Sequence, residues 1–236
     1  PGPGIGKSPM QHVTVTEPLE CIAIDIVGPL PITSNDNQYI MVIGDYFSKW
    51  KEAFALPDHT AQTVADKLVR EFICKFGAPY RIHTDQGREL ESEIFSEICS
   101  LLGIAKSRTT PYHPQSDGMI ERFNRTLQQM LAIFVDENRT NWDDHLPYLM
   151  MAYRATVHES TKCTPNLIML GKEITLPIDV IAGSPPMQHQ HEGCYSSYVE
   201  WVRNSMEMSF SIVHDNLKSS FKRQKRYYDT KLKPRA

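Results

Sequence analysis

One carboxylate stands inside an otherwise apolar stretch near the amino terminus and limits what this chain can fold into. Asp25 lies in the run Cys21–Val27, whose other six residues are all apolar. A run of this length, rich in Ile and Val, predicts a buried β-strand. A bare carboxylate in such a strand is costly unless it is paired, and hard divalent cations are common partners of clustered carboxylates.

Two further acids stand at positions that suit a shared site. Asp85 follows the short apolar strand predicted at Arg81–Thr84, and Glu121 lies on a helix predicted from Ser116 to Val135, with 35 residues between the two acids. Taken singly, each acid also fits an ordinary role: a hydrogen-bonded buried Asp, a turn Asp and a solvated helical Glu. Three carboxylates on three elements together predict a metal site for phosphoryl transfer, with two ions about 3.5–4 Å apart.

Bulk composition narrows the class of protein. The chain has 236 residues, of which 41% are hydrophobic, so it can form one sizeable core, or a core and a small appendage. It has no apolar stretch of the roughly 18 residues that a membrane span needs. Its five cysteines show no C-x-x-C pair, which favours reduced thiols in an intracellular setting over a disulfide scaffold or a zinc finger.

Charge is distributed unevenly. The formal net charge is −3, yet the segment Lys218–Arg235 holds eight basic residues and one acidic residue, so the rest of the chain is acidic. A basic tail on an acidic body can bind a polyanion through the tail and a local groove. The alternative is that the tail is only the solvated face of a helix.

Periodicity and turn signals divide the chain into four parts. We predict a linker at 1–17, a core at 18–180, a second linker at 181–194 and a basic helical extension at 195–236. Within the core the order of elements predicts an α/β fold, with a mixed five-stranded sheet flanked by helices. Strands are expected at 19–27, 39–45, 50–56, 81–84 and 104–107, and helices at 60–75, 92–103, 116–135, 142–155 and 164–170, followed by an irregular exit and a long amphipathic helix at 195–228.

Four motifs carry a resemblance to a known family. They are Asp25–Pro31, Asp45–Trp50, His83–Glu89 and Tyr112–Leu127. In combination they resemble the catalytic core of retroviral and retrotransposon integrases, most closely the gypsy-type branch, and the resemblance is dense over about residues 18–180. The helical segment that ends in the basic residues before Asp229 is also typical of that branch.

The resemblance implies a fold, a reaction and partners. It implies a ribonuclease-H-like fold and a catalytic, metal-binding triad of Asp25, Asp85 and Glu121 that holds two Mg²⁺ (or Mn²⁺) ions. It implies a polynucleotidyl transferase that trims DNA ends and joins a 3′-hydroxyl to target DNA, acting as a homo-oligomer on double-stranded DNA, with no membrane partner and no small-molecule cofactor. The expected location is the nucleus, with a cytoplasmic phase in a retroelement particle.

Several side chains are candidate DNA contacts, although each also suits a plain surface position. The full set is Lys49, Arg88, His113, Gln115, Ser116, Arg122, Arg125, Lys222, Arg223, Lys225 and Arg226.

Two rival functions stay open from the sequence. One is a related nuclease or transposase on the same fold, and the other is a host-domesticated, non-catalytic nucleic-acid-binding protein. The apolar stripe of the carboxyl-terminal helix packs either on its own core or on a partner, and we expect a weak, concentration-dependent dimer.

Overall fold

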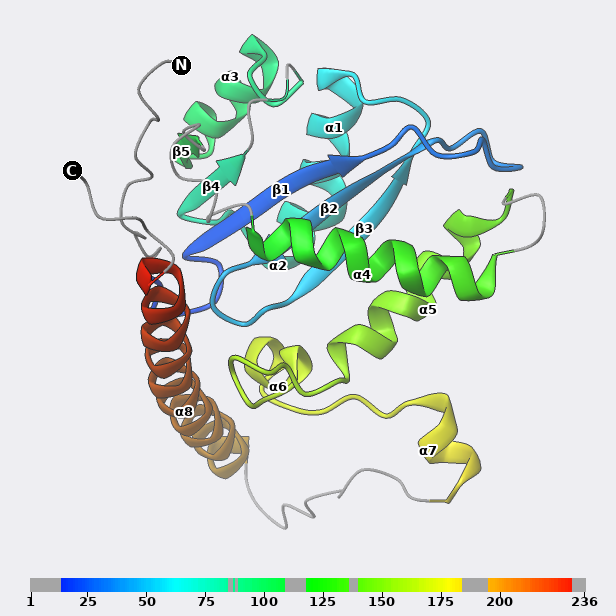
Figure 1. Cartoon of the computed structure of the whole chain (residues 1–236). Helices are drawn as coiled ribbons and strands as arrows, with labels where there is room; N and C mark the ends of the chain where they lie inside the picture. The colour runs from blue at the N-terminus through cyan, green and yellow to red at the C-terminus, as the bar shows by residue number, and fades with distance from the viewer. Residues whose placement is uncertain are drawn as a thin grey trace.

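A mixed five-stranded sheet forms the centre of the molecule (Figure 1), as the sequence predicts. The computed structural model describes residues 14–84, 87, 89–108, 118–135, 140–183 and 195–230, without the side chains of 195–203, 205, 229 and 230. The strand order is β3-β2-β1-β4-β5. The strands are β1 (Cys21–Val27), β2 (Tyr39–Asp45), β3 (Lys51–Leu56), β4 (Arg81–Thr84) and β5 (Ala105–Arg108).

The central strand β1 pairs differently on its two sides. It runs antiparallel to β2, with Asp25 opposite Val42, and parallel to β4, with Ile24 opposite Thr84. The outer pairs follow the same division, since β2–β3 is antiparallel and β4–β5 is parallel. This mixture is what consecutive hairpins followed by helical crossovers produce.

Helices cover both faces of the sheet. They are α1 (Ala61–Lys67), a π-helical segment η1 (Leu68–Ile73), α2 (Cys74–Phe76), α3 (Glu93–Leu101), α4 (Gly118–Phe134), α5 (Trp142–Arg154), α6 (Pro165–Leu170), α7 (Pro177–Ile181) and α8 (Tyr195–Thr230). The expected irregular exit after α6 instead contains α7, where Pro177 occupies the first turn and suits a helix start. No described helix is long and apolar enough to cross a membrane.

Alternation along β1 divides the apolar side chains between two cores. Ile22 and Ile24 pack on the face covered by α1, η1 and α3, whereas Cys21 and Ala23 pack on the face covered by α4 and α5. Because successive side chains of a strand point to opposite faces, Asp25 belongs to the α4 face. The strand register therefore directs this carboxylate toward α4.

The long helix α8 packs on the core of its own chain. Val213 is fully buried, and the ring of Phe210 meets the ring of Phe47 with centroids 5.4 Å apart. The Asn216 side-chain amide donates to the Thr161 carbonyl over 3.0 Å. The described part of the apolar stripe thus has an intramolecular partner.

The loop between β1 and β2 is attached to the start of α5 by a cluster of hydrogen bonds around Asp143. Its Oδ2 accepts from Thr33 Oγ1 at 2.8 Å, Asn35 Nδ2 at 3.1 Å and Asn37 Nδ2 at 2.7 Å. Partial burial acts to raise the pKa of Asp143, but these three donors outweigh it and the pKa lies below its ordinary value. The ionised form of this carboxyl group therefore stabilises the fold.

A second ionisable group lies inside the core on the α4 face. The side chain of Lys51 is 1% exposed, crosses Gly44 of β2, and places Nζ 5.7 Å from the centroid of the Phe123 ring. Its Nζ has no hydrogen-bond partner among the described residues. Burial lowers the pKa of Lys51 to about 7; Lys49 and Arg122 also lower it, and Asp45 opposes them.

We predict that Asp143→Ala lowers the free energy of unfolding at pH 7 by about 1–2 kcal/mol, because three donors are left without their half-buried charged acceptor. Since the folded-state pKa lies below the unfolded value, this stability is present above the unfolded pKa and is lost as the pH falls below about 4. Urea unfolding at pH 7 and at pH 2.5 measures both effects. Asp144→Ala is the matched control, since Asp144 is exposed in the same helical turn; equal losses in the two variants would contradict the prediction.

We predict that Lys51→Met stabilises the protein at pH 6 by about 1–3 kcal/mol, because it replaces a buried, unpartnered ammonium with an apolar chain of similar length. In the native chain, Lys51 loses its proton above pH 7 in the folded state but keeps it up to about pH 10 in the unfolded state. The free energy of unfolding therefore rises with pH over that interval. Denaturant unfolding from pH 6 to 9 measures the slope of the free energy of unfolding against pH. Lys51→Met reduces that slope by at most about 1.4 kcal/mol per pH unit. Lys75→Met, at an exposed position, is the control; an unchanged slope in Lys51→Met would refute the assignment.

Candidate active site

Asp25 is held by donors from two different elements. One carboxylate oxygen, Oδ1, accepts from the backbone N–H of Ile26 at 2.9 Å, and the other, Oδ2, accepts from the Asn124 side-chain amide at 2.6 Å. Asp25 is half-buried, while the apolar residues that precede it in β1 are buried. The carboxylate therefore lies where β1 meets α4, at the border between core and solvent.

Glu121 lies in the first turn of α4, three residues before Asn124, and is exposed. Residues three apart share one side of a helix, so Glu121 lies one turn from the residue that contacts Asp25. The helix is fixed against the sheet by a buried stripe of Ile120, Phe123, Leu127 and Leu131. A carboxylate near a helix amino terminus is also favoured by the helix dipole.

Asp85 falls outside the described residues, as do Arg88, His113, Gln115 and Ser116. The structure does describe the strand that leads to Asp85. Thr84, the last residue of β4, is buried and lies opposite Ile24 of β1, the residue just before Asp25. The parallel register therefore places the end of β4 beside the residue that precedes Asp25.

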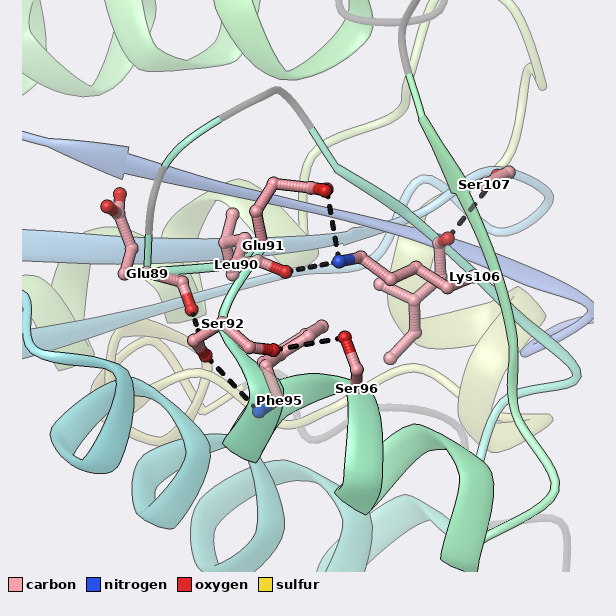
Figure 2. A network of polar contacts seen from close by, with 9 residues as sticks. Glu89, Leu90, Glu91, Ser92, Phe95, Ser96, Lys106 and Ser107 are labelled. Carbon is pink, nitrogen blue, oxygen red and sulfur yellow. Dashed lines mark hydrogen bonds and ion pairs between the residues drawn. The ribbon is translucent and has the colours of Figure 1, made fainter.

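The chain just beyond Asp85 is fixed by the network shown in Figure 2. The Lys106 ammonium, from β5, donates to the Leu90 carbonyl and pairs with Glu91 Oε1 at 3.0 Å. Leu90 is fully buried, and Ser92 Oγ caps α3 by accepting from the Phe95 N–H at 3.3 Å. These contacts fix the loop from residue 89 to α3 on the face of the sheet opposite α4.

The β2–β3 turn holds a buried acid and a half-buried lysine. Asp45 accepts from the Leu19 N–H at 2.9 Å and from both the N–H and the hydroxyl of Ser48 at 2.6 Å. Burial raises the pKa of Asp45, although the Ser48 and Leu19 donors and the Lys49 charge oppose that rise. Asp45 thus has a structural role in this turn.

Lys49, a candidate phosphate contact, is engaged within this turn. It has a positive φ of 63° and donates from Nζ to the Tyr46 carbonyl at 2.6 Å. Burial lowers the pKa of Lys49 to about 8, with Asp45 opposing the change and Arg122 adding to it. A DNA phosphate that binds Lys49 must compete with the Tyr46 carbonyl.

The remaining described candidates lie on two helices. Arg122 and Arg125 are exposed on α4, next to Glu121. The basic group of α8 is also exposed, and one member, Arg223, forms an ion pair of 3.3 Å with Glu159 of the core. That group consists of Lys222, Arg223, Lys225 and Arg226.

Sequence reasoning missed three polar residues whose contacts depend on the assembled fold. Asn124 lies inside the third motif, but its partner lies 99 residues earlier in the chain. The partners of Lys106 are similarly distant, and Lys51 occupies a strand position where alternation gave no sign of burial. Only the three-residue spacing of Asn124 from Glu121 offered a signal.

Comparisons with known proteins agree with this geometry. Residues 15–114 match the integrase core domain family. The Retrovirus-related Pol polyprotein from transposon 412 of Drosophila melanogaster is 27% identical over 94% of this chain and 18% of its own length. Gypsy retrotransposon integrase-like protein 1 of Bos taurus is 28% identical over 72% of this chain and 34% of its own length. The chain thus spans about a third or less of the curated relatives it matches.

Solved structures share the fold. A chain of the simian T-cell lymphotropic virus intasome, in complex with a PP2A regulatory subunit, superposes with a TM-score of 0.60 and 22% identity, covering 81% of this chain and 66% of that one. The HTLV-2 integrase catalytic core domain, in complex with magnesium, gives a TM-score of 0.52 and 20% identity over 65% of this chain and 97% of its own. This chain is therefore similar to integrase core domains, in sequence over residues 15–114 and in fold over a larger part of its length.

Proposed function

We propose that this chain is the catalytic core of a metal-dependent DNA integrase, a polynucleotidyl transferase that inserts retroelement DNA into target DNA. One observation carries the proposal: the only acid of an otherwise apolar central strand contacts α4 one turn from Glu121, beside the strand that leads to Asp85. Carboxylates on rigid neighbouring elements are what in-line phosphoryl transfer requires.

The residues fit a hard divalent cation. Within the described part of the chain no three His, Cys, Asp or Glu side chains form a metal-binding group, and Asp85 lies outside that part. Asp25 accepts hydrogen bonds from Ile26 and Asn124, and carboxylate oxygens are ligands that coordinate such ions. Mg²⁺ and Mn²⁺ prefer such oxygen ligands.

Each acid has its own role in the proposed site. Asp25 would serve as a ligand shared by two ions, with Asp85 as a further ligand for one and Glu121 for the other. Bound Mg²⁺ or Mn²⁺ neutralises charge at the reacting phosphate and activates the attacking hydroxyl group. The 3′-hydroxyl of the element then attacks a target phosphodiester in line with the departing oxygen, and water takes its place when DNA ends are trimmed.

The DNA partner is assigned to the surface around α4. Arg122 and Arg125 lie next to Glu121 on the exposed side of the helix and suit backbone phosphates, and the segment before α4 supplies His113, Gln115 and Ser116. Arg88 is likewise assigned to backbone phosphates. Joining two element ends to one target requires more than one active site, so the proposed active form is a homo-oligomer that works in the nucleus.

Asp25→Asn tests the chemistry. Strand transfer should fall by at least about a hundredfold, since residues that merely orient metal ligands already cost about 10- to 100-fold. Thermal unfolding should stay near that of the native chain, because Asn keeps the shape of the side chain. A gel assay with element-end DNA and Mg²⁺ measures transfer, and Asp144→Asn serves as the control.

The same assay separates the rivals. Cleavage without joining by the native chain would favour the nuclease or transposase. DNA binding with neither reaction would favour a domesticated, non-catalytic protein, and an active Asp25→Asn variant would refute the assigned site.

The basic group of α8 gives a second test. Replacing Lys222, Arg223, Lys225 and Arg226 with Gln should weaken DNA binding for all sequences and flatten its dependence on salt, by about 0.9 in logarithmic slope for each phosphate that the variant no longer neutralises. Fluorescence anisotropy from 50 to 300 mM salt measures the slope. Lys67→Gln with Lys75→Gln removes charge from the α1–α2 surface as a control, and an unchanged slope in the α8 variant would mean that this group is only a solvated surface.

A further inference from the structure

We infer that Phe210 of α8 is a positioning residue, which acts through Phe47 to hold the β2–β3 turn, and with it Lys49, beside the first turn of α4. The inference rests on the proposed function, because it deepens the role of Lys49 as a contact to DNA phosphate. Its physical basis is the edge-to-face packing of the Phe210 and Phe47 rings, with centroids 5.4 Å apart and ring planes at 83°.

Phe47 anchors the β2–β3 turn in the core. Its side chain is fully buried. It belongs to the same apolar cluster as Val213 and Leu217 of α8, and Phe210 packs against that cluster. Aromatic rings that meet edge to face at this separation attract one another beyond the effect of the area that they bury. The anchor of the turn therefore receives part of its packing from α8.

Lys49, two residues after Phe47, has a backbone conformation that needs support. Its φ of 63° lies in the left-handed region, which a residue other than glycine keeps only where the surrounding structure fixes it. The Tyr153 hydroxyl, from α5, donates to the Lys49 carbonyl at 3.0 Å. The Phe210 ring, from α8, packs on Phe47. Two helices that lie far apart in the sequence thus hold this short turn.

The turn also determines where the Lys49 ammonium lies. Its Nζ donates to the Tyr46 carbonyl at 2.6 Å and lies 4.0 Å from the sulfur of Met119, two residues before Glu121. Burial lowers the pKa of Lys49 only to about 8, so the ammonium is mostly charged at pH 7. A DNA phosphate near Glu121 would therefore meet a cation whose place depends on the turn.

Other contacts keep α8 docked when the Phe210 ring is removed. Val213 is fully buried and Leu217 is buried, both further along the helix. The Asn216 side-chain amide donates to the Thr161 carbonyl at 3.0 Å. Truncation of Phe210 therefore removes a contact to the turn without releasing the helix, so its effect on Lys49 can be measured apart from undocking.

Hydrogen exchange of the full chain, without DNA, tests the positioning step. In Phe210→Ala the backbone amides of residues 45–50 should exchange at least about tenfold faster, because loss of the ring makes local opening of the turn easier. Phe210→Leu keeps much of the apolar volume and should give a smaller increase, of about threefold. The amides of β4 and α3 should keep native rates. Met208→Ala is the matched control, since Met208 is 68% exposed and lies two residues earlier in α8.

Strand-transfer kinetics test the consequence for DNA. Phe210→Ala should raise the KM for element-end DNA by about fivefold with kcat nearly unchanged, because a phosphate contact away from the reacting group binds substrate and transition state equally. In a Lys49→Gln background, Phe210→Ala should raise the KM no further, since both residues act through one contact.

The outcomes separate this inference from the proposed function. Native exchange rates at residues 45–50 in both Phe210 variants would overturn the inference and leave the proposed function intact. Additive effects of Phe210→Ala and Lys49→Gln on the KM would also overturn it, because Phe210 would then act by a route other than Lys49. A native chain that performs no transfer would overturn the proposed function, and the exchange rates would still decide whether Phe210 holds the turn.

Discussion

Apolar packing on both faces of β1 is the constraint on which the rest of the structure depends. The strand is paired on both edges and covered on both sides, so its side chains up to Ile24 have no access to water. A carboxylate is tolerated only where that burial ends, and Asp25 occupies the position at which exposure begins. The location of this carboxylate is therefore set by the limits of the hydrophobic core.

Positively charged side chains lie on the same side of the sheet as Asp25. Lys49 and Arg122 add to the effect of burial in lowering the pKa of Lys51, and Arg122 does the same for Lys49. Burial first, and then these three cations, lower the pKa of His158 to about 4. His158 is consequently neutral at physiological pH. The electrostatic environment beneath α4 is thus produced by burial first and by neighbouring cations second.

Local sequence predicts the structure correctly where the feature depends on one helix or one strand alone. The strands and the main helices follow from alternation and helical spacing, and Thr60 begins α1 as its sequence predicts, by accepting from the Thr63 N–H. The five-residue helix α7 was missed because its length gives no periodicity to detect. The motifs around Asp25 and Glu121 predict these acids as site residues, and that part stays a prediction.

Contacts between distant segments could not be predicted in this way. Asn124 meets Asp25 only because α4 crosses β1, and Lys106 meets the chain beyond Asp85 only because β5 lies beside β4. Both pairings depend on the assembled sheet and not on the spacing of residues. The sequence also does not say that Lys51 turns inward, since its burial requires the space left by Gly44.

The docking of α8 has a consequence for how the protein meets a polymer. A helix of 36 residues is about 54 Å long and keeps its direction over that length. Because its middle is fixed to the core by Val213 and Leu217, the basic group that follows is held at a fixed place relative to the sheet. In the proposed function, a stretch of DNA bound by this helix would be presented to the site around Asp25 at a high effective concentration, because the helix acts as a rigid spacer.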